Sequence, residues 1–177
     1  MTNTMTKTRE GGFTLLELLL VIGVAALLLI GGIATYRLVS EGNKTTDSTR
    51  LLLTIRQQTQ TMAQQSSGSY VGIDFDTTAP DATEALVVAG ILKEGQRNPF
   101  NGNIFIQGAA NQLTVRFEGL PKAACVRLMQ SMTNPSDLIS VAGNGGATLS
   151  GTDIPVTATN AAAGCTGTSN TITWVFP

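Results

Sequence analysis

A run of 22 residues near the N-terminus, residues 13–34, contains a single charged side chain, Glu17. As a helix that rises about 1.5 Å per residue, the run is long enough to cross the roughly 30 Å hydrocarbon core of a bilayer. A polar segment with Lys7 and Arg9 precedes it, which favours a cytoplasmic leader and an exported C-terminal part. Cations also follow the run, so this charge asymmetry is modest.

Two ordinary interpretations of the run leave Glu17 unexplained. A secretory signal peptide has an apolar region of about 7–15 residues, shorter than this one, before a small-residue cleavage site such as "GGIAT" at 31–35. A plain membrane anchor fits the length. However, a carboxylate inside a membrane-spanning helix costs on the order of 3 kcal/mol near the centre and less near an end, and such residues usually have a partner.

Cleavage after the "GG" pair at residues 11–12 would supply that partner. Phe13 would gain a free α-amine, and Glu17 lies four residues on, on the same helical face. If several helices packed side by side, the amine of one would face Glu17 of the next, in surroundings that exclude water and strengthen the pair. The sequence therefore predicts that Glu17 is an assembly residue that acts after cleavage.

The stretch "GGFTLLELLLVIGV" resembles the class III signal of type IV prepilins and related pseudopilins. The pattern is a short basic leader ending in glycine, an apolar residue, threonine, two apolar residues and glutamate. The resemblance implies processing at Gly11, Gly12 and Phe13: a prepilin peptidase cuts after Gly12 and N-methylates Phe13. It also implies that Glu17, with Phe13, recruits and registers each subunit in a filament.

The next segment, residues 35–66, is expected to continue the helix as an amphipathic half. Leu52, Ile55, Thr59 and Met62 fall on one face at helical spacing, so this face should lie on the core of a domain.

The remainder of the chain predicts an α+β fold. Gly68 is expected to end the long helix. Further helices are expected at 81–93 and at 120–132 with Pro121 in its first turn, and strands at 103–107, 112–118, 137–142, 154–158 and 171–176. The sum is a long N-terminal helix packed on an antiparallel sheet.

Cys125 and Cys165 are the only cysteines. The chain has no histidine and no CxxC pair, so we do not expect a zinc site. A widely spaced pair behind an export-type N-terminus indicates one disulfide in an oxidising compartment. Closing a loop of about 40 residues contributes roughly 4 kcal/mol by chain-entropy arithmetic. Two buried free thiols are the alternative.

Catalysis and nucleic-acid binding are not expected. The chain has no GxSxG, P-loop or HExxH motif and no histidine base, and its net charge is −1. Asp74 and Asp76 in "GIDFDTT" raise the possibility of a calcium site. That loop lacks the regular series of oxygen ligands, so we interpret it as a solvated loop and expect no metal or cofactor.

A second resemblance covers most of the chain. "NPFNGN" at 98–103 followed by a strand, and Cys125 on a helix after "GL", resemble the type IVb pilins of toxin-coregulated, bundle-forming and conjugative thin pili. The short leader and Phe13 depart from that pattern, because type IVb leaders are often longer and Phe is typical of type IVa. The resemblance implies a cleaved leader (1–12), a transmembrane and filament-core helix (13–34), its amphipathic continuation (35–66), and a globular head (67–177) with a clamped region (125–165).

The function that this resemblance implies is that of a major structural pilin. Such a subunit waits in the inner membrane with its C-terminal domain in the periplasm, and an assembly platform and ATPase polymerise it into an extracellular pilus. Its expected partners are itself, the prepilin peptidase, minor pilins and a host or recipient-cell surface. A minor pilin or type II secretion pseudopilin shares the same N-terminus, although the clamped region favours a true pilin. A monomeric membrane-anchored periplasmic binding domain would give Glu17 no role.

Overall fold

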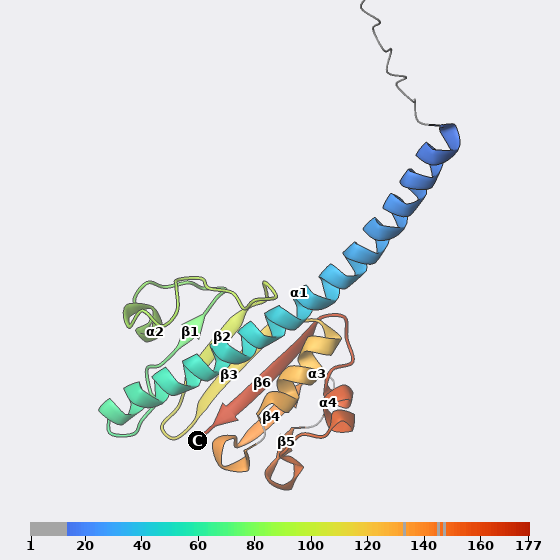
Figure 1. The fold of residues 1–177 in the computed structure, drawn as a ribbon. Helices are drawn as coiled ribbons and strands as arrows, with labels where there is room; N and C mark the ends of the chain where they lie inside the picture. The colour runs from blue at the N-terminus through green and yellow to red at the C-terminus, as the bar shows by residue number, and fades with distance from the viewer. Residues whose placement is uncertain (1–13, 133, 145, 147) are drawn as a thin grey trace, which may run out of the picture. The chain divides into compact units, whose positions relative to one another are not determined.

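The computed structural model describes residues 14–132, 134–144, 146 and 148–177. The chain divides into two compact units, one up to Ser40 and the other from Glu41 to Pro177. Helix α1 (Leu15–Gln65) runs through both units (Figure 1).

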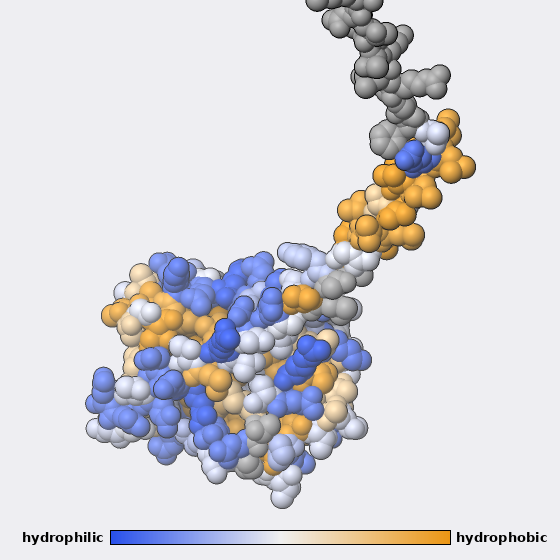
Figure 2. Space-filling model, in the orientation of Figure 1, coloured by the Kyte–Doolittle hydropathy of each residue, from blue (hydrophilic) through white to orange (hydrophobic). Residues whose placement is uncertain are grey.

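The first unit contains the apolar part of α1. Its segment Leu15–Ile33 has a mean hydropathy of 2.6, and it is the one helical segment of the described chain long and apolar enough to cross a membrane. Every residue of this segment is exposed, and Figure 2 shows its surface as almost continuously hydrophobic. The predicted apolar helix is therefore present, and no other described residue buries this segment.

The second half of α1 has the predicted amphipathic pattern. Leu52, Ile55 and Thr59 are completely buried, and Met62 packs partly buried against the core. Leu53, the neighbour of Leu52, is 46% exposed. One face of this half therefore contributes to the core of the second unit, as its spacing predicts.

Helix α1 ends in a left-handed turn. Ser67 has a φ of 60° and Gly68 a φ of 83°. The Gly68 N–H donates to the Ala63 carbonyl at 2.7 Å, which satisfies one of the last carbonyls of the helix. Gly68 thus has the predicted role in the stop signal, although Ser67 also takes the unfavourable conformation.

The second unit contains one six-stranded sheet with every pairing antiparallel. Its strand order is β1-β2-β3-β6-β4-β5, so the most C-terminal strand lies between β3 and β4. The strands are β1 (Phe75–Asp76), β2 (Ile104–Gly108), β3 (Leu113–Leu120), β4 (Ser140–Gly143), β5 (Leu149–Ser150) and β6 (Asn170–Phe176).

The core lies on one face of this sheet. In β6 the side chains of Ile172, Trp174 and Phe176 are buried and alternate with partly exposed neighbours. The rings of Trp174 and Phe117 meet edge to face with centroids 5.4 Å apart. Figure 1 shows α1 and α3 (Lys122–Ser131) on the same face of the sheet, so the core is formed between them and the strands. The predicted α+β class is confirmed.

The helix predicted at 81–93 is wrong in extent, because α2 covers only Ala85–Val88. An Asx turn precedes it, in which Asp81 Oδ1 accepts from the Thr83 N–H. The helix ends before Gly90, which has a φ of 70°. Local side-chain bonding and one glycine thus overrule the helix propensity of the segment.

The strand predicted at 154–158 is also wrong. Residues Gly151–Asp153 form a short 3₁₀ helix, the Ile154–Pro155 bond is cis, and α4 (Ala158–Gly164) follows. Thr157 caps α4, because its Oγ1 accepts from the Asn160 N–H at 3.2 Å. Thr157, inside the predicted strand, is therefore a helix cap.

Other predicted boundaries need smaller corrections. Pro121 precedes α3 as its N-cap residue instead of lying in the first turn. The strand predicted at 137–142 starts later, at Ser140, because Pro135–Asp137 form a 3₁₀ helix capped by the side chain of Asn134. The two-residue strands β1 and β5 were not predicted, since so short a segment has no readable periodicity.

Candidate functional site

The predicted assembly residue Glu17 lies in the first turn of α1. The backbone N–H of Glu17 donates to Thr14 Oγ1 at 3.3 Å, so the side chain of Thr14 caps the start of the helix. A carboxylate at this end is favoured by the helix dipole. Glu17 is exposed and is the only charged residue of the segment Leu15–Ile33.

The predicted processing residues Gly11, Gly12 and Phe13 lie outside the described residues. The pairing of the Phe13 amine with Glu17 therefore stays a prediction. The exposed apolar segment Leu15–Ile33 contains Glu17. Its length and hydropathy suit membrane anchoring.

The predicted disulfide joins Cys125 on α3 to Cys165 at the C-terminal end of α4. Both cysteines are completely buried, their Cα atoms are 5.9 Å apart, and no free cysteine remains. Met129 lies beside the bridge, with its Sδ 3.5 Å from Cys165 Sγ. The bridge clamps the two helices that flank the C-terminal part of the head.

The backbones of β4 and α4 also approach each other closely in the region that the disulfide clamps. The glycines Gly143 and Gly164 approach so closely that a Cβ on Gly143 would collide with the carbonyl of Gly164. A Cβ on Gly164 would press on Met129. Glycine is therefore required where β4 meets the end of α4, a feature that the sequence pattern alone does not reveal.

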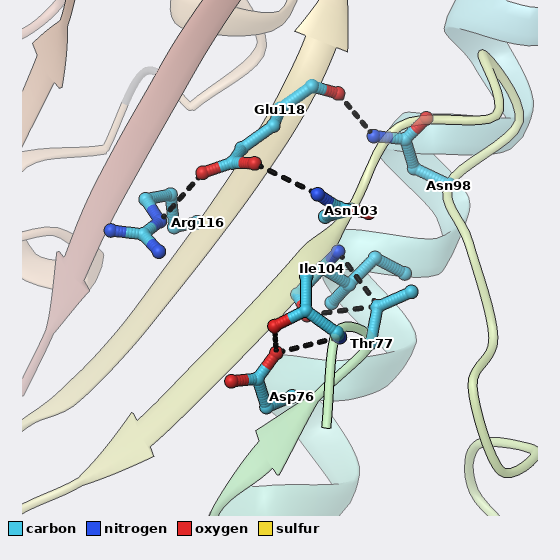
Figure 3. Close-up of polar contacts among 8 residues, drawn as sticks. Asp76, Thr77, Asn98, Asn103, Ile104, Arg116 and Glu118 are labelled. Atoms are coloured by element: carbon cyan, nitrogen blue, oxygen red, sulfur yellow. Dashed lines mark hydrogen bonds and ion pairs between the residues drawn. The ribbon is translucent and has the colours of Figure 1, made fainter. Parts of the chain in front are cut away.

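The "NPFNGN" motif connects the loop that precedes β2 to strand β3 through a hydrogen bond between Asn98 and Glu118 (Figure 3). Asn98 is 3% exposed, and its Nδ2 donates to the Glu118 carbonyl at 2.7 Å. Its Oδ1 accepts from the N–H groups of Phe100 and Gly102. A Cβ on Gly102 would collide with the Glu118 carbonyl. The motif is thus structural: it fastens the loop to the sheet.

Thr77 fastens the same loop at a second point. Its Oγ1 accepts from the Ile104 N–H at 2.9 Å and donates to the Gln96 carbonyl at 2.8 Å. The side chain is 6% exposed, so these bonds satisfy a buried hydroxyl. Figure 3 shows Thr77 between the loop and strand β2.

The sheet face opposite the core carries a row of polar and aromatic side chains. Strand pairing places Asp76 opposite Phe105, Phe105 opposite Arg116, and Arg116 opposite Thr173. The Arg116 guanidinium stacks 4.0 Å from the centroid of the Phe105 ring, and its Nε lies 3.4 Å from Glu118 Oε1. The charge of Arg116 is thereby matched within its own strand.

Next to this row is a hollow of about 400 Å³, which we call the acidic hollow. Three carboxylates line it: Asp74, Asp76 and Glu84. Asp74 accepts from the Gly108 N–H, Asp76 from Thr78, and Glu84 Oε1 from the Asp76 N–H. The sequence suggested only Asp74 and Asp76, because Glu84 reaches the hollow from a different segment.

The carboxylates of the acidic hollow have different proton affinities. Hydrogen bonds from the side chain and N–H of Thr78 lower the pKa of Asp76 despite some desolvation. Burial raises the pKa of Glu84, and repulsion from Asp81, Asp76 and Asp74 adds to this rise. In the described part of the chain, no group of three or more histidine, cysteine or acidic residues is placed to hold a metal ion. The bonds of these carboxylates are to the backbone and to Thr78.

Comparison with known proteins assigns the chain to a family. Residues 42–176 match the family described as PilS N terminal. The toxin coregulated pilin of Vibrio cholerae is 30% identical over 151 residues, which cover 81% of this chain and 67% of that protein.

Two solved structures are similar to this chain, and the first shares its fold. The crystal structure of TcpA, a type IV pilin from the El Tor biotype of Vibrio cholerae, matches with a TM-score of 0.50 and 18% identity, over 76% of this chain and 99% of that one. The type IV b pilin from Salmonella typhi matches with a TM-score of 0.48 and 22% identity, over 75% and 97% of the two chains.

The family match spans nearly the whole second unit, and the first unit supplies an apolar N-terminal helix that suits membrane anchoring. The matched TcpA structure shares the fold of this chain. This chain therefore belongs to the PilS family and is a type IV pilin, a structural protein and not an enzyme.

Proposed function

We propose that this chain is the major structural subunit of a type IVb pilus. The observation that carries the proposal is the exposed apolar segment Leu15–Ile33 with the single carboxylate Glu17. In a membrane, lipid covers this segment. In a filament, the same segments of other copies cover it. The segment is therefore exposed within one copy because it is covered first by the membrane and then by other subunits of the filament.

Processing follows from the N-terminal motif. A prepilin peptidase removes residues 1–12 by cutting after Gly12, with Gly11 in the recognition motif, and N-methylates Phe13. Before assembly the helix lies in the inner membrane with the head in the periplasm. An assembly platform and ATPase then transfer the subunit into an extracellular filament.

Glu17 supplies the specificity for the filament over the membrane, which the hydrophobic effect does not provide. Lipid tails are as apolar as leucine, so apolar burial does not distinguish the membrane from the filament core. An ion pair between the Phe13 amine of one copy and Glu17 of another is specific and strong in a dry environment. It therefore fixes the register in which subunits join.

The head, residues 67–177, forms the shell of the filament in this proposal. The loops between Cys125 and Cys165 face outward, and adhesion, aggregation or conjugative contact with a host or recipient cell follows from that surface. Minor pilins join the same filament through the same type of N-terminal helix.

The intact mass and N-terminal peptide of the protein in a sheared cell-surface fraction test this proposal. We expect a chain that starts at N-methylated Phe13 and is two hydrogens lighter than the dithiol because of the Cys125–Cys165 bond. A start at Met1, or soluble protein cut near Thr35, contradicts it. A processed chain far less abundant than another pilin in the fraction indicates a minor pilin instead.

Replacing Glu17 tests the assembly step. The Glu17→Ala variant is expected to stay in the membrane and to be cut, yet to yield no filaments in the sheared fraction. The matched control is Leu18→Ala, at a neighbouring exposed position, which leaves the carboxylate in place and retains filaments. Normal filaments from Glu17→Ala contradict the amine–carboxylate pairing.

A further inference from the structure

The sequence contains two asparagine–glycine pairs, Asn101–Gly102 in the "NPFNGN" motif and Asn144–Gly145 after β4. Asparagine is among the chemically labile residues of proteins. A following glycine makes it more reactive, because glycine has no Cβ to shield the backbone nitrogen that attacks the side-chain amide. Asn101 is exposed, so its amide is in contact with water. The first pair is therefore a candidate for spontaneous modification.

The reaction of such a pair proceeds in two steps. The Gly102 backbone nitrogen attacks Cγ of Asn101, so that a new N–Cγ bond forms and the Cγ–Nδ2 bond breaks. The amide proton of Gly102 leaves with Nδ2 as ammonia, and the ring that remains is a succinimide. Water then opens the ring at either carbonyl, its hydroxyl adding to carbon and its proton returning to nitrogen, which gives aspartate or iso-aspartate. Neither step needs an enzyme, an oxidant or a cofactor.

The peptide unit between Asn101 and Gly102 is held at both of its polar atoms. Its N–H donates to Asn98 Oδ1 at 3.0 Å, and its carbonyl oxygen accepts from Arg97 Nη1 at 3.2 Å. Ring closure removes the proton of this N–H, so it breaks the bond to Asn98. The two bonds therefore oppose the first step of the reaction.

Asn98 is itself fixed, because it is 3% exposed and has further partners. Its Nδ2 donates to the Glu118 carbonyl at 2.7 Å (Figure 3), and its backbone N–H donates to the Gly102 carbonyl at 3.0 Å. Gly102 lies against strand β3, where a Cβ would collide with the Glu118 carbonyl. The attacking nitrogen is thus held by a buried amide that cannot rotate without losing bonds of its own.

We propose that Asn101–Gly102 is a self-modification site of the head and that Asn98 guards it. While the contacts of Asn98 are intact, the Gly102 nitrogen is not available to Asn101. When the loop opens locally, the nitrogen is released and Asn101 cyclises. Iso-aspartate adds one atom to the main chain and a negative charge, so the loop no longer forms the same bonds to Asn98. The modification is therefore a permanent record that a head has opened, and it does not depend on the proposed function.

The first test compares the folded and the unfolded wild-type chain. The full chain in detergent is incubated in heavy-oxygen water at mildly alkaline pH, with and without denaturant, and peptide mapping follows conversion at Asn101. The water that opens the ring carries the heavy isotope into the product, so conversion during later handling is not counted. We expect Asn101 to react at least about tenfold more slowly in the folded chain, since two hydrogen bonds hold its peptide unit.

Asn144 provides a reference within every sample. Both asparagines precede glycine, so in the unfolded chain they are expected to react at similar rates. Gly145 lies outside the described residues, and the rate at Asn144 in the folded chain therefore serves as a measured baseline. A change in the stability of the whole head alters both rates, whereas a change in the guard alters only the rate at Asn101.

Replacing Asn98 tests the guard directly. Asn98→Ala removes the acceptor of the Gly102 N–H and is expected to raise the folded-state rate at Asn101 at least about threefold. The rate at Asn144 is expected to stay unchanged. The matched control is Thr157→Ala, which removes the cap of α4, leaves the contacts of Asn98 in place and is expected to retain the wild-type rate at Asn101. Asn101→Gly, which suits the φ of 65° at this position, removes the amide and is expected to abolish the signal.

Arg97→Ala is a second variant, which leaves the buried contacts of Asn98 intact. Arg97 is exposed, so this variant is expected to fold and to raise the rate at Asn101 by about two- to threefold through loss of one bond. If Asn98→Ala does not fold, this rate decides: an increase supports the guard, and an unchanged rate overturns it.

The remaining outcomes are distinct from a failure of the proposed function, since none of these measurements requires a filament. Equal rates at Asn101 in the folded and unfolded chain overturn the guard. A folded Asn98→Ala variant without acceleration at Asn101, or with equal acceleration at Asn144, overturns it as well. An unfolded chain that does not react at Asn101 shows that the modification site does not exist.

Discussion

Arg56 connects parts of the head that lie 81 positions apart in the chain. Its Nη2 is 2.8 Å from Asp137 Oδ1, and its guanidinium lies 5.4 Å from the centroid of the Phe176 ring. The contact fastens the 3₁₀ helix Pro135–Asp137 to α1. No local sequence pattern predicts the contact between Arg56 and Asp137, because the helical spacing places Arg56 among the polar residues on the solvent side of the helix.

The ion pair predicts a specific acid sensitivity. The hydrogen bond and positive charge of Arg56 lower the pKa of Asp137 below its usual value. The folded state therefore gains stability above the ordinary aspartate pKa of about 3.9, and this gain is lost as the pH falls through the lowered value. In urea unfolding of the detergent-solubilised chain, Asp137→Asn is expected to be less stable at neutral pH and to lose less stability between about pH 5 and pH 2.

The matched control for this measurement is Asp153→Asn, which removes an exposed carboxylate that forms no ion pair in the described chain. It is expected to preserve the pH dependence of the wild type. Equal slopes for wild type and Asp137→Asn would show that the Arg56 contact does not contribute to acid sensitivity.

At the scale of elements, the periodicity of apolar residues predicted the long helices and strands and did not predict the short ones. The spacing of Leu52, Ile55 and Thr59 predicted the buried face of α1, and the apolar ending "TITWVF" predicted β6. Strands β1 and β5 contain two residues each, and α4 is recognisable only from its cap. Such elements are set by pairing and packing with distant residues.

The candidate sites divide in the same way. The motif from Gly11 to Glu17 is contiguous, so the sequence alone indicates it. The acidic hollow combines Asp74, Glu84 and Arg116 from three separate segments, which the fold brings together. No sequence spacing identifies such a group, so the sequence suggested only Asp74 and Asp76, which are near neighbours in the chain.

Adjacent leucines on α1 give a direct test of the buried face. Leu52→Ala is expected to lower the free energy of unfolding by about 2–5 kcal/mol, because it leaves a cavity in the core. Leu53→Ala, at a 46% exposed position, is expected to change it by less than about 0.5 kcal/mol. Denaturant unfolding of the full chain in detergent measures both, and equal effects would contradict the predicted register of the helix.

At the scale of the whole molecule, the two units rely on different sources of stability. The head has a shared core of helices and strands, reinforced by the Cys125–Cys165 bond. The described residues Leu15–Ile33 of α1 are all exposed, and in the proposed function they are stabilised by lipid or by other copies. The low charged fraction of the chain, 13%, reflects this division.

Removing the disulfide tests how far it supports the head. The Cys125→Ser, Cys165→Ser variant is expected to lose about 2–5 kcal/mol of unfolding free energy, since the unfolded chain regains the freedom of a long loop. Denaturation of wild type with and without reductant gives the same comparison without substitution. If reductant leaves the wild-type midpoint unchanged, the bond does not contribute this stability.

The central position of β6 has a consequence for incomplete chains. Strands β3 and β4 have no shared neighbour until residues 170–176 arrive between them. Any chain that stops before Asn170 thus leaves two unpaired strand edges and an open core, the features that invite aggregation and proteolysis. The fold thereby provides a check on chain length: damaged or prematurely terminated copies differ from finished ones in their exposed strand edges, and under the proposed function this difference keeps them out of the filament.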